Sequence, residues 1–267
     1  MTRENILFGT WKDRLTIKKS MEIAEWAVEN TRRLSLAFKL VVCPSFTALQ
    51  TISRIISGSK VGLSAQNMRW DDPKIVLTGE ISAEMLLEVG CTYVIIGHSE
   101  RRLYLNETNE LVSLKVSSAV KHNLIPIICV GEQYEERRKG ISQKIIEEQV
   151  DAAITGLSEC KQYGHTVFAY EPAWAISTSH IAIPLDPQEA NKMHRMIRDL
   201  LHSKIGQKFA ENVTIVYGGS VNQNNVGTYF SQPEIDGGLV GTASQSIASY
   251  AQLVKISQEV FSAKATK

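Results

Sequence analysis

One glutamate stands where a carboxylate could act as a base. Glu171 follows the short β-rich run Thr166–Tyr170 and precedes Pro172, so a strand is expected to end and a loop to begin at this residue. In parallel α/β proteins, active sites form at the carboxyl ends of strands, where loops vary and strands hold their bases rigid. Glu171 is therefore a candidate general base. The alternative is one half of a surface ion pair.

Polar residues follow two other β-rich runs. Lys12 comes after Ile6–Gly9, either as a fixed cation for an anionic substrate or as a solvated charge. His98 ends Tyr93–Gly97 and opens a polar, helix-like segment, whose N–H groups and dipole would keep its imidazole neutral. The alternative is a histidine that only caps the turn. Glu100 could orient Lys12 or belong to a solvated charge cluster.

Two glycine turns and one long connection suggest a site for an anion. The turns, Tyr217–Ser220 and Gly238–Ser244, each lead toward a helical pattern, and loops after the last two strands form the phosphate cradle typical of (β/α)₈ enzymes. The segment from Pro172 to Ala182 has the length of a lid that could close over a bound anion and exclude water. It could equally be an ordinary connection.

Eight short β-rich runs alternate with amphipathic segments such as Ile141–Leu157. This alternation in 267 residues predicts an α/β fold, a single-domain (β/α)₈ TIM barrel spanning residues 1–267. A doubly wound open sheet would usually have a glycine-rich dinucleotide turn after its first strand, and Gly9–Lys12 is not one. The expected strands are Ile6–Gly9, Lys39–Cys43, Val61–Ala65, Tyr93–Gly97, Ile125–Val130, Val167–Tyr170, Val213–Tyr217 and Gly237–Gly241.

Composition favours a cytoplasmic protein that acts on a small molecule. A net charge of +1 supplies no basic field for nucleic acid. No run approaches membrane-spanning length, and the N-terminus lacks the apolar segment of a signal peptide. The cysteines have no metal-ligand spacing and are expected to be reduced core residues. They are Cys43, Cys91, Cys129 and Cys160.

Seven motifs, taken in order and at their spacings, resemble the triosephosphate isomerase family from the first strand to the last. They are Thr10–Lys12, Ala65–Asn67, Thr78–Ser82, Gly97–Arg102, Cys129–Glu132, Tyr170–Ile176 and Tyr217–Ser220. The resemblance implies that Glu171 moves a proton between adjacent carbons and that His98 is the neutral electrophile at the carbonyl. It further implies that Lys12 holds the substrate and stabilises the enediolate, with Glu100 in support.

The resemblance also implies a phosphate site, no cofactor or metal, and a homodimer. The loop from Met68 to Glu80 would reach into the partner subunit, where Thr78 would brace the neighbouring Lys12. The implied activity interconverts dihydroxyacetone phosphate and D-glyceraldehyde 3-phosphate, a step of glycolysis and gluconeogenesis. Residues expected to bind the substrate are Thr10, Lys12, Ser177, Ser220, Gly241 and Thr242.

Several residues around the expected substrate differ from the family pattern. The asparagine usual before Trp-Lys is a threonine, and two lid glycines are serines, which costs about 1 kcal/mol wherever positive φ is required. The second glycine of the last phosphate loop is a β-branched residue, and a charged pair replaces methionine and asparagine near the expected subunit contact. These residues are Thr10, Ser177, Ser179, Thr242, Asp13 and Arg14.

Three functions remain open at this point. The first is triosephosphate isomerisation. The second is isomerisation of a four-carbon sugar phosphate such as L-erythrulose 1-phosphate, whose branch of the family also replaces the asparagine and the second glycine, although with arginine where this chain has Thr242. The third is a phosphate-binding barrel without catalysis, and the joint presence of Lys12, His98 and Glu171 argues against it.

Overall fold

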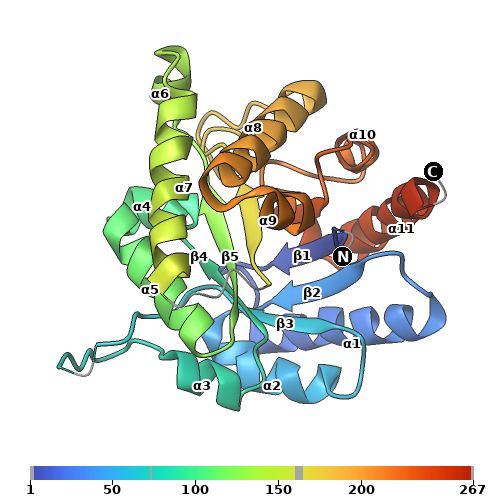
Figure 1. The fold of residues 1–267 in the computed structure, drawn as a ribbon. Helices are drawn as coiled ribbons and strands as arrows, with labels where there is room; N and C mark the ends of the chain where they lie inside the picture. The colour runs from blue at the N-terminus through green and yellow to red at the C-terminus, as the bar shows by residue number, and fades with distance from the viewer. Residues whose placement is uncertain (1–2, 73, 160–164, 266–267) are drawn as a thin grey trace.

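A computed structural model describes residues 3–72, 74–159 and 165–265, and they form a closed parallel barrel with helices around it (Figure 1). The strands pair in sequence order, and β8 closes the ring against β1. The predicted (β/α)₈ barrel is confirmed. Its strands are β1 (Ile6–Thr10), β2 (Lys39–Cys43), β3 (Gly62–Ala65), β4 (Tyr93–Ile96), β5 (Ile125–Val130), β6 (Val167–Tyr170), β7 (Thr214–Tyr217) and β8 (Gly237–Val240).

Helices follow the strands and cover the outside of the barrel. Several begin at a side-chain cap, as where the Asp186 carboxylate accepts the N–H groups of Gln188 and Glu189 ahead of the proline that opens α8. The helices are α1 (Ile17–Arg33), α2 (Phe46–Ile56), α3 (Ala83–Glu88), α4 (Ser99–Leu105), α5 (Asn109–Lys121), α6 (Tyr134–Arg138), α7 (Ser142–Glu159), α8 (Pro187–Ile205), α9 (Gln207–Asn212), α10 (Val226–Phe230) and α11 (Ile247–Ala265), with a short 3₁₀ turn, η1 (Thr242–Ser244).

Alternating side chains along each strand divide the core into two parts. In β1, Phe8 belongs to the cluster inside the barrel, while Leu7 packs outward with the helices. Because both faces are buried, the strands read as continuous apolar runs. Both clusters fix the strand ends, and therefore the side chains just beyond them, on a rigid base.

The observed strands differ from the predicted ones by single residues at five ends. β1 continues to Thr10, which pairs in register with Cys43 of β2. β4 stops before Gly97, whose φ of 73° turns the chain toward His98. Likewise β3 and β7 begin one residue later, and β8 ends one residue earlier, than predicted.

Three of the cysteines, Cys43, Cys91 and Cys129, are buried and free, as expected. Cys160 lies outside the described residues. A search of the described helices found none both long and apolar enough to cross a membrane.

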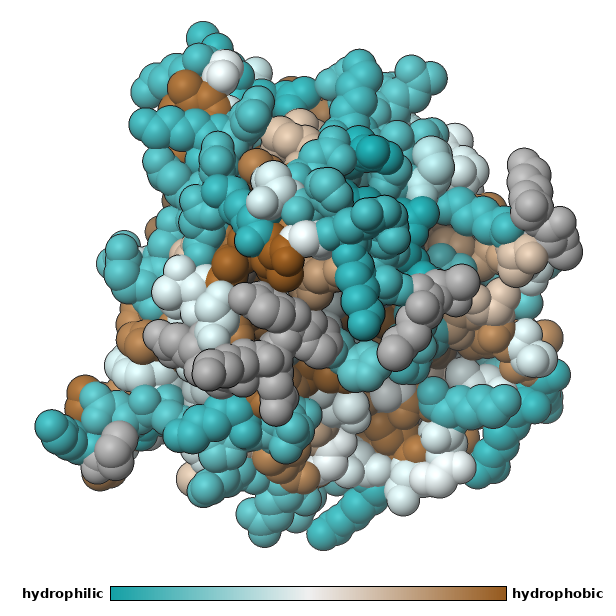
Figure 2. Space-filling view, viewed as in Figure 1, coloured by the Kyte–Doolittle hydropathy of each residue, from teal (hydrophilic) through white to brown (hydrophobic). Residues whose placement is uncertain are grey.

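The connection between β3 and α3 extends away from the barrel (Figure 1, teal). Its described end carries exposed hydrophobic residues (Figure 2), and Val76 is 94% exposed. Near the base of this loop, the Arg69 guanidinium donates to the carbonyl oxygens of Trp70 at 3.0 Å and Ile75 at 2.8 Å. These bonds tie Arg69 to the described residues on both sides of the loop.

Candidate active site

Glu171 lies just beyond β6 and is buried against the loop that follows β4. Its N–H donates to Val130 O at 2.8 Å, which extends the β5–β6 pairing to this residue. One carboxylate oxygen accepts the Ser99 N–H at 2.8 Å, and the other lies 2.7 Å from His98 Nε2. The side chain is only 3% exposed. A shielded carboxylate with two donors is therefore fixed at the mouth of the barrel.

His98 is the N-cap of α4, so its ring has a defined tautomer. Nδ1 accepts the N–H of Glu100 at 3.2 Å. Because a backbone N–H can only donate, Nδ1 holds a lone pair and the ring proton resides on Nε2, facing Glu171. The helix dipole also opposes an added positive charge. The neutral imidazole expected at this helix N-terminus stays a prediction.

Opposing effects set the proton affinity of Glu171. Burial by itself raises the pKa of this carboxyl group, but hydrogen bonds from the His98 ring and the Ser99 N–H lower it, with a smaller contribution from Lys12. The net pKa lies below the ordinary value. The group is therefore a carboxylate at neutral pH, the form that accepts a proton.

Lys12 and Glu100 form an ion pair next to this site. Lys12 Nζ lies 2.6 Å from Glu100 Oε1, with 13% and 30% of the two side chains exposed. Burial raises the pKa of Glu100, but attraction to Lys12 and hydrogen bonds from Lys12 and Thr178 outweigh this effect, so the net pKa is lowered. Lys12 has φ of 51°, an uncommon left-handed conformation for a residue with a side chain. Gln66 donates to the carbonyl oxygens of Lys12 and Cys43, both at 2.9 Å, and holds this turn.

The residues expected to bind phosphate converge on one side of the barrel mouth. The hydroxyl groups of Ser177 and Thr242 lie 2.8 Å apart, joining the segment after β6 to the turn after β8. Gly241 packs close to Lys12, whose Cε would lie 3.5 Å from an added Cβ. The N–H of Ser220 donates to Ala175 O at 2.9 Å, so in this conformation it is already used. Thr10 is buried at the end of β1, on the same side of the barrel.

Two neighbouring glycines keep this side of the site open. A Cβ on Gly218 would lie 3.2 Å from Glu171 Cβ, and one on Gly219 would collide with the ring of Tyr217. Side chains here would displace Glu171 or the tyrosine, which explains the pair of glycines after β7.

The segment from residue 172 to residue 186 is irregular, as predicted for the lid, and both of its ends are fixed. At the first end, Trp174 Nε1 donates to the buried Glu132 at 3.0 Å. At the second end, the hydroxyl of Tyr229 donates to Leu185 O. These two contacts anchor the segment to the barrel at both ends.

Sequence reasoning overlooked three groups of this site. The Ser99 N–H holds Glu171, the Gln66 amide holds the Lys12 turn, and the Thr178 hydroxyl donates to Glu100 at 2.7 Å. All three lie inside motifs or segments singled out from the sequence. Their partners lie far away along the chain, so these contacts could not be predicted from local patterns.

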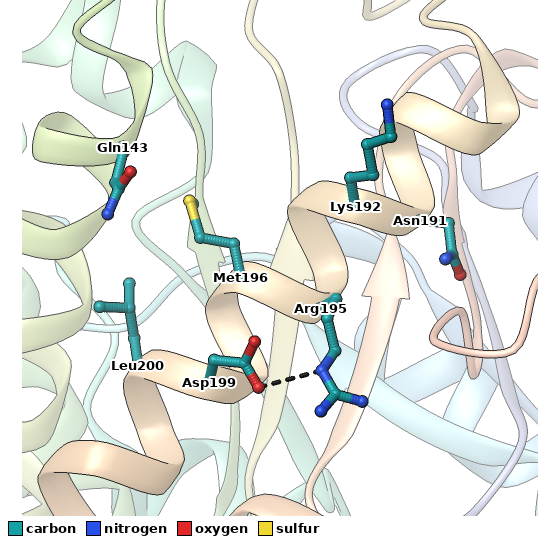
Figure 3. Close-up of a pocket in the computed structure, with 7 residues that line it drawn as sticks. All are labelled: Gln143, Asn191, Lys192, Arg195, Met196, Asp199 and Leu200. Carbon is teal, nitrogen blue, oxygen red and sulfur yellow. Dashed lines mark hydrogen bonds and ion pairs between the residues drawn. The ribbon is translucent and has the colours of Figure 1, made fainter.

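A second hollow, of about 520 Å³, lies between α7 and α8 (Figure 3). Its cations are already paired, because Lys192 contacts Glu189 at 2.6 Å and Arg195 contacts Asp199 at 3.0 Å. It thus offers no free charge for an anion. Within the described ranges, no three His, Cys, Asp or Glu side chains group as metal ligands.

A closed barrel with a carboxylate, a neutral imidazole and a lysine at its strand ends defines a (β/α)₈ protein suited to proton transfer on an anionic substrate. Residues 5–257 match the family model described as triosephosphate isomerase. Among relatives called triosephosphate isomerase, that of Roseiflexus castenholzii is 41% identical, covering 94% of this chain and 97% of its own. Those of Dictyoglomus turgidum and Prosthecochloris aestuarii are 40% and 38% identical, over 95% and 96% of this chain and 99% of their own.

The chain therefore belongs to the triosephosphate isomerase family.

Proposed function

We propose that this chain interconverts dihydroxyacetone phosphate and D-glyceraldehyde 3-phosphate by proton transfer through an enediolate. The observation that carries the proposal is the pairing of Glu171 with His98, in which a buried carboxylate faces the protonated nitrogen of a neutral imidazole at 2.7 Å. Isomerisation needs one group to take a proton from carbon and another to donate to the carbonyl oxygen. These two side chains supply both groups.

The roles follow from the contacts of each side chain. Substrate entering the site replaces the contact between Glu171 and His98, so that the carboxylate faces the carbon and Nε2–H faces the carbonyl oxygen. Glu171 removes a proton from C1 of dihydroxyacetone phosphate and returns it to C2. Lys12 stabilises the negative charge on the enediolate oxygen, and Glu100 holds Lys12 in place.

We propose that the phosphate group of the substrate binds where the segment after β6 meets the turns after β7 and β8. N–H groups at helix and turn starts bind phosphate well, because their dipoles and unused donors point toward the anion. Thr10, at the end of β1 beside β8, stands in place of an amide donor. The donors come from Ser177, Gly241 and Thr242, and from Ser220 once its N–H leaves Ala175 O.

A homodimer is part of the proposal. The projecting loop carries Ile75, Val76 and Leu77 exposed at its end, and an apolar tip of this kind is suited to insertion into another subunit. Thr78 follows this tip and would brace the partner's active-site turn. Asp13 and Arg14 beside Lys12 are exposed in the single chain and would line the contact.

We propose that residues 1–267 form one domain. We further propose that the protein acts in the cytoplasm, in glycolysis and gluconeogenesis. Three buried free thiols suit a reducing compartment. The alternative is a four-carbon substrate such as L-erythrulose 1-phosphate.

Isomerisation in D₂O tests the proposed chemistry. A carboxylate that removes a carbon-bound proton exchanges it with solvent, so D-glyceraldehyde 3-phosphate formed from dihydroxyacetone phosphate would carry deuterium at C2 when followed by NMR. Glu171→Gln should abolish both turnover and labelling, and Glu25→Gln, at an exposed position of α1, is the matched control. Unchanged labelling in Glu171→Gln would sink the proposal.

A further inference from the structure

Two hydroxyl groups meet across the expected phosphate site. Ser177, in the segment between β6 and α8, lies with its Oγ 2.8 Å from Oγ1 of Thr242, in the turn after β8. The two residues are 65 positions apart in the sequence, so this contact exists only because the segment lies over the barrel mouth. Both replace glycines of the family pattern, so the contact belongs to this chain's own side chains.

The next residue makes a second connection to the barrel. Thr178 Oγ1 donates to Glu100 at 2.7 Å and accepts from Lys12 Nζ at 3.1 Å. Two successive lid residues are thus tied to both halves of the proposed site. Glu100 and Lys12 also form an ion pair with each other. The bond between Ser177 and Thr242 lies at the proposed phosphate site, and a bound phosphate would have to replace it.

A hollow beside the lid leaves room for it to move. This space, of about 250 Å³, lies between α4, the start of α6 and the lid. Leu103 and Tyr104 of α4 are exposed along it, and Ile181 of the lid faces the same space. The lid therefore occupies one side of a space that it could enter on opening.

We propose that the Ser177 and Thr242 hydroxyls are positioning residues that latch the lid over the site before the substrate arrives. The phosphate then separates the two hydroxyls and accepts a hydrogen bond from each. This inference rests on the proposed function, because it needs a phosphate at this position. A hydrogen bond to a charged acceptor is stronger than one between two neutral hydroxyls, so the exchange favours the bound state.

The exchange predicts an unusual pattern in a double-mutant cycle. Removing either hydroxyl loses one bond to phosphate but also removes the latch that phosphate must break, so each single loss is partly offset. Removing both hydroxyls loses two bonds to phosphate, but the cost of breaking the latch is avoided only once. The double variant should therefore lose more affinity than the product of the two single losses.

The test measures binding of inorganic phosphate by calorimetry to wild type, Ser177→Ala, Thr242→Val and the double variant. Each single variant should bind about fivefold more weakly and the double variant about 100-fold more weakly, exceeding the product of roughly 25-fold. KM for D-glyceraldehyde 3-phosphate should rise in the same pattern, with a smaller effect on kcat. Thr242→Ser keeps the hydroxyl and should restore affinity, while Ser203→Ala on the exposed face of α8 is the control.

Three outcomes would overturn the inference. If the loss of phosphate affinity in the double variant equals the product of the two single losses, no latch exists. If the single variants bind phosphate more tightly than wild type, the hydroxyls hold the lid but do not contact phosphate. Unchanged binding would exclude both roles. In each case, intact Glu171-dependent turnover would leave the proposed function standing, whereas failure of wild type to bind phosphate and turn over the triose would remove both.

Discussion

Nε2 of His98 lies 2.7 Å from a carboxylate oxygen of Glu171, while Nδ1 of the same ring accepts the Glu100 N–H at 3.2 Å. One backbone hydrogen bond thus fixes which nitrogen faces the base. The imidazole is held as a neutral donor, and the carboxylate beside it remains charged. This pairing brings together His98 and Glu171, which are 73 residues apart in the chain and lie just beyond the ends of β4 and β6.

Shortening the base should remove most of the activity. Glu171→Asp withdraws the carboxylate by about one methylene, and misplacement of about 1 Å costs on the order of 100-fold in rate. We expect kcat for D-glyceraldehyde 3-phosphate to fall by about 100-fold, with KM changing little, in a steady-state assay. Glu25→Asp controls for the substitution itself. Equal kcat in wild type and Glu171→Asp would mean that another group is the base.

The tautomer of His98 can be observed directly. Nitrogen NMR of labelled protein should show Nδ1 of this residue as an unprotonated acceptor and Nε2 as protonated, because the Glu100 N–H occupies Nδ1. His202, exposed on α8, serves as an internal comparison in the same spectra. A His98 ring that carries protons on both nitrogens at pH 7 would contradict the neutral electrophile.

Glu107 should be needed for stability. Its carboxylate pairs with the buried Lys115 at 2.6 Å and with Arg101 at 2.6 Å. Glu107→Gln leaves a buried ammonium group without its counter-charge, so the free energy of unfolding should fall by about 3 kcal/mol in urea titrations. Adding Lys115→Met removes the unpaired charge and should recover much of the loss. A double variant less stable than Glu107→Gln would refute this account.

The same carboxylate should give a defined pH dependence. Burial raises the pKa of Glu107, but attraction to Lys115 and hydrogen bonds from Lys115 and Arg101 outweigh it and set the pKa below its ordinary value of 4.5. The contribution of the Glu107 carboxylate to the free energy of unfolding is therefore complete above pH 4.5 and is lost as the pH falls through the folded-state pKa. The stability difference between wild type and Glu107→Gln should shrink below pH 4.5. A difference that grew on acidification would contradict the sign.

The projecting loop should control subunit association. Val76→Asp places a charge on an apolar tip, and burying an unpaired charge in an interface is costly. Light scattering after size exclusion should show a dimer for wild type and a larger monomer fraction for the variant. Leu114→Asp, at an exposed apolar position of α5, is the control. A wild-type monomer would refute the proposed assembly.

The barrel could be predicted from the sequence, because its apolar strands and amphipathic helices alternate in a pattern with few architectures. Glu171 and His98 could be placed at strand ends for the same reason. The Ser99 N–H that holds Glu171 and the hydroxyl contact between Ser177 and Thr242 could not, because they depend on how far a loop folds over the barrel. Strand ends shifted by one residue where a glycine such as Gly97 turns the chain.

The most direct test of the central claim compares kcat/KM of the purified protein on D-glyceraldehyde 3-phosphate and on L-erythrulose 1-phosphate at matched concentrations. The account predicts that the triose phosphate is preferred by at least about 100-fold, with kcat/KM toward the diffusional range near 10⁸ M⁻¹s⁻¹. Preference for the four-carbon substrate, or no turnover of either, would contradict it.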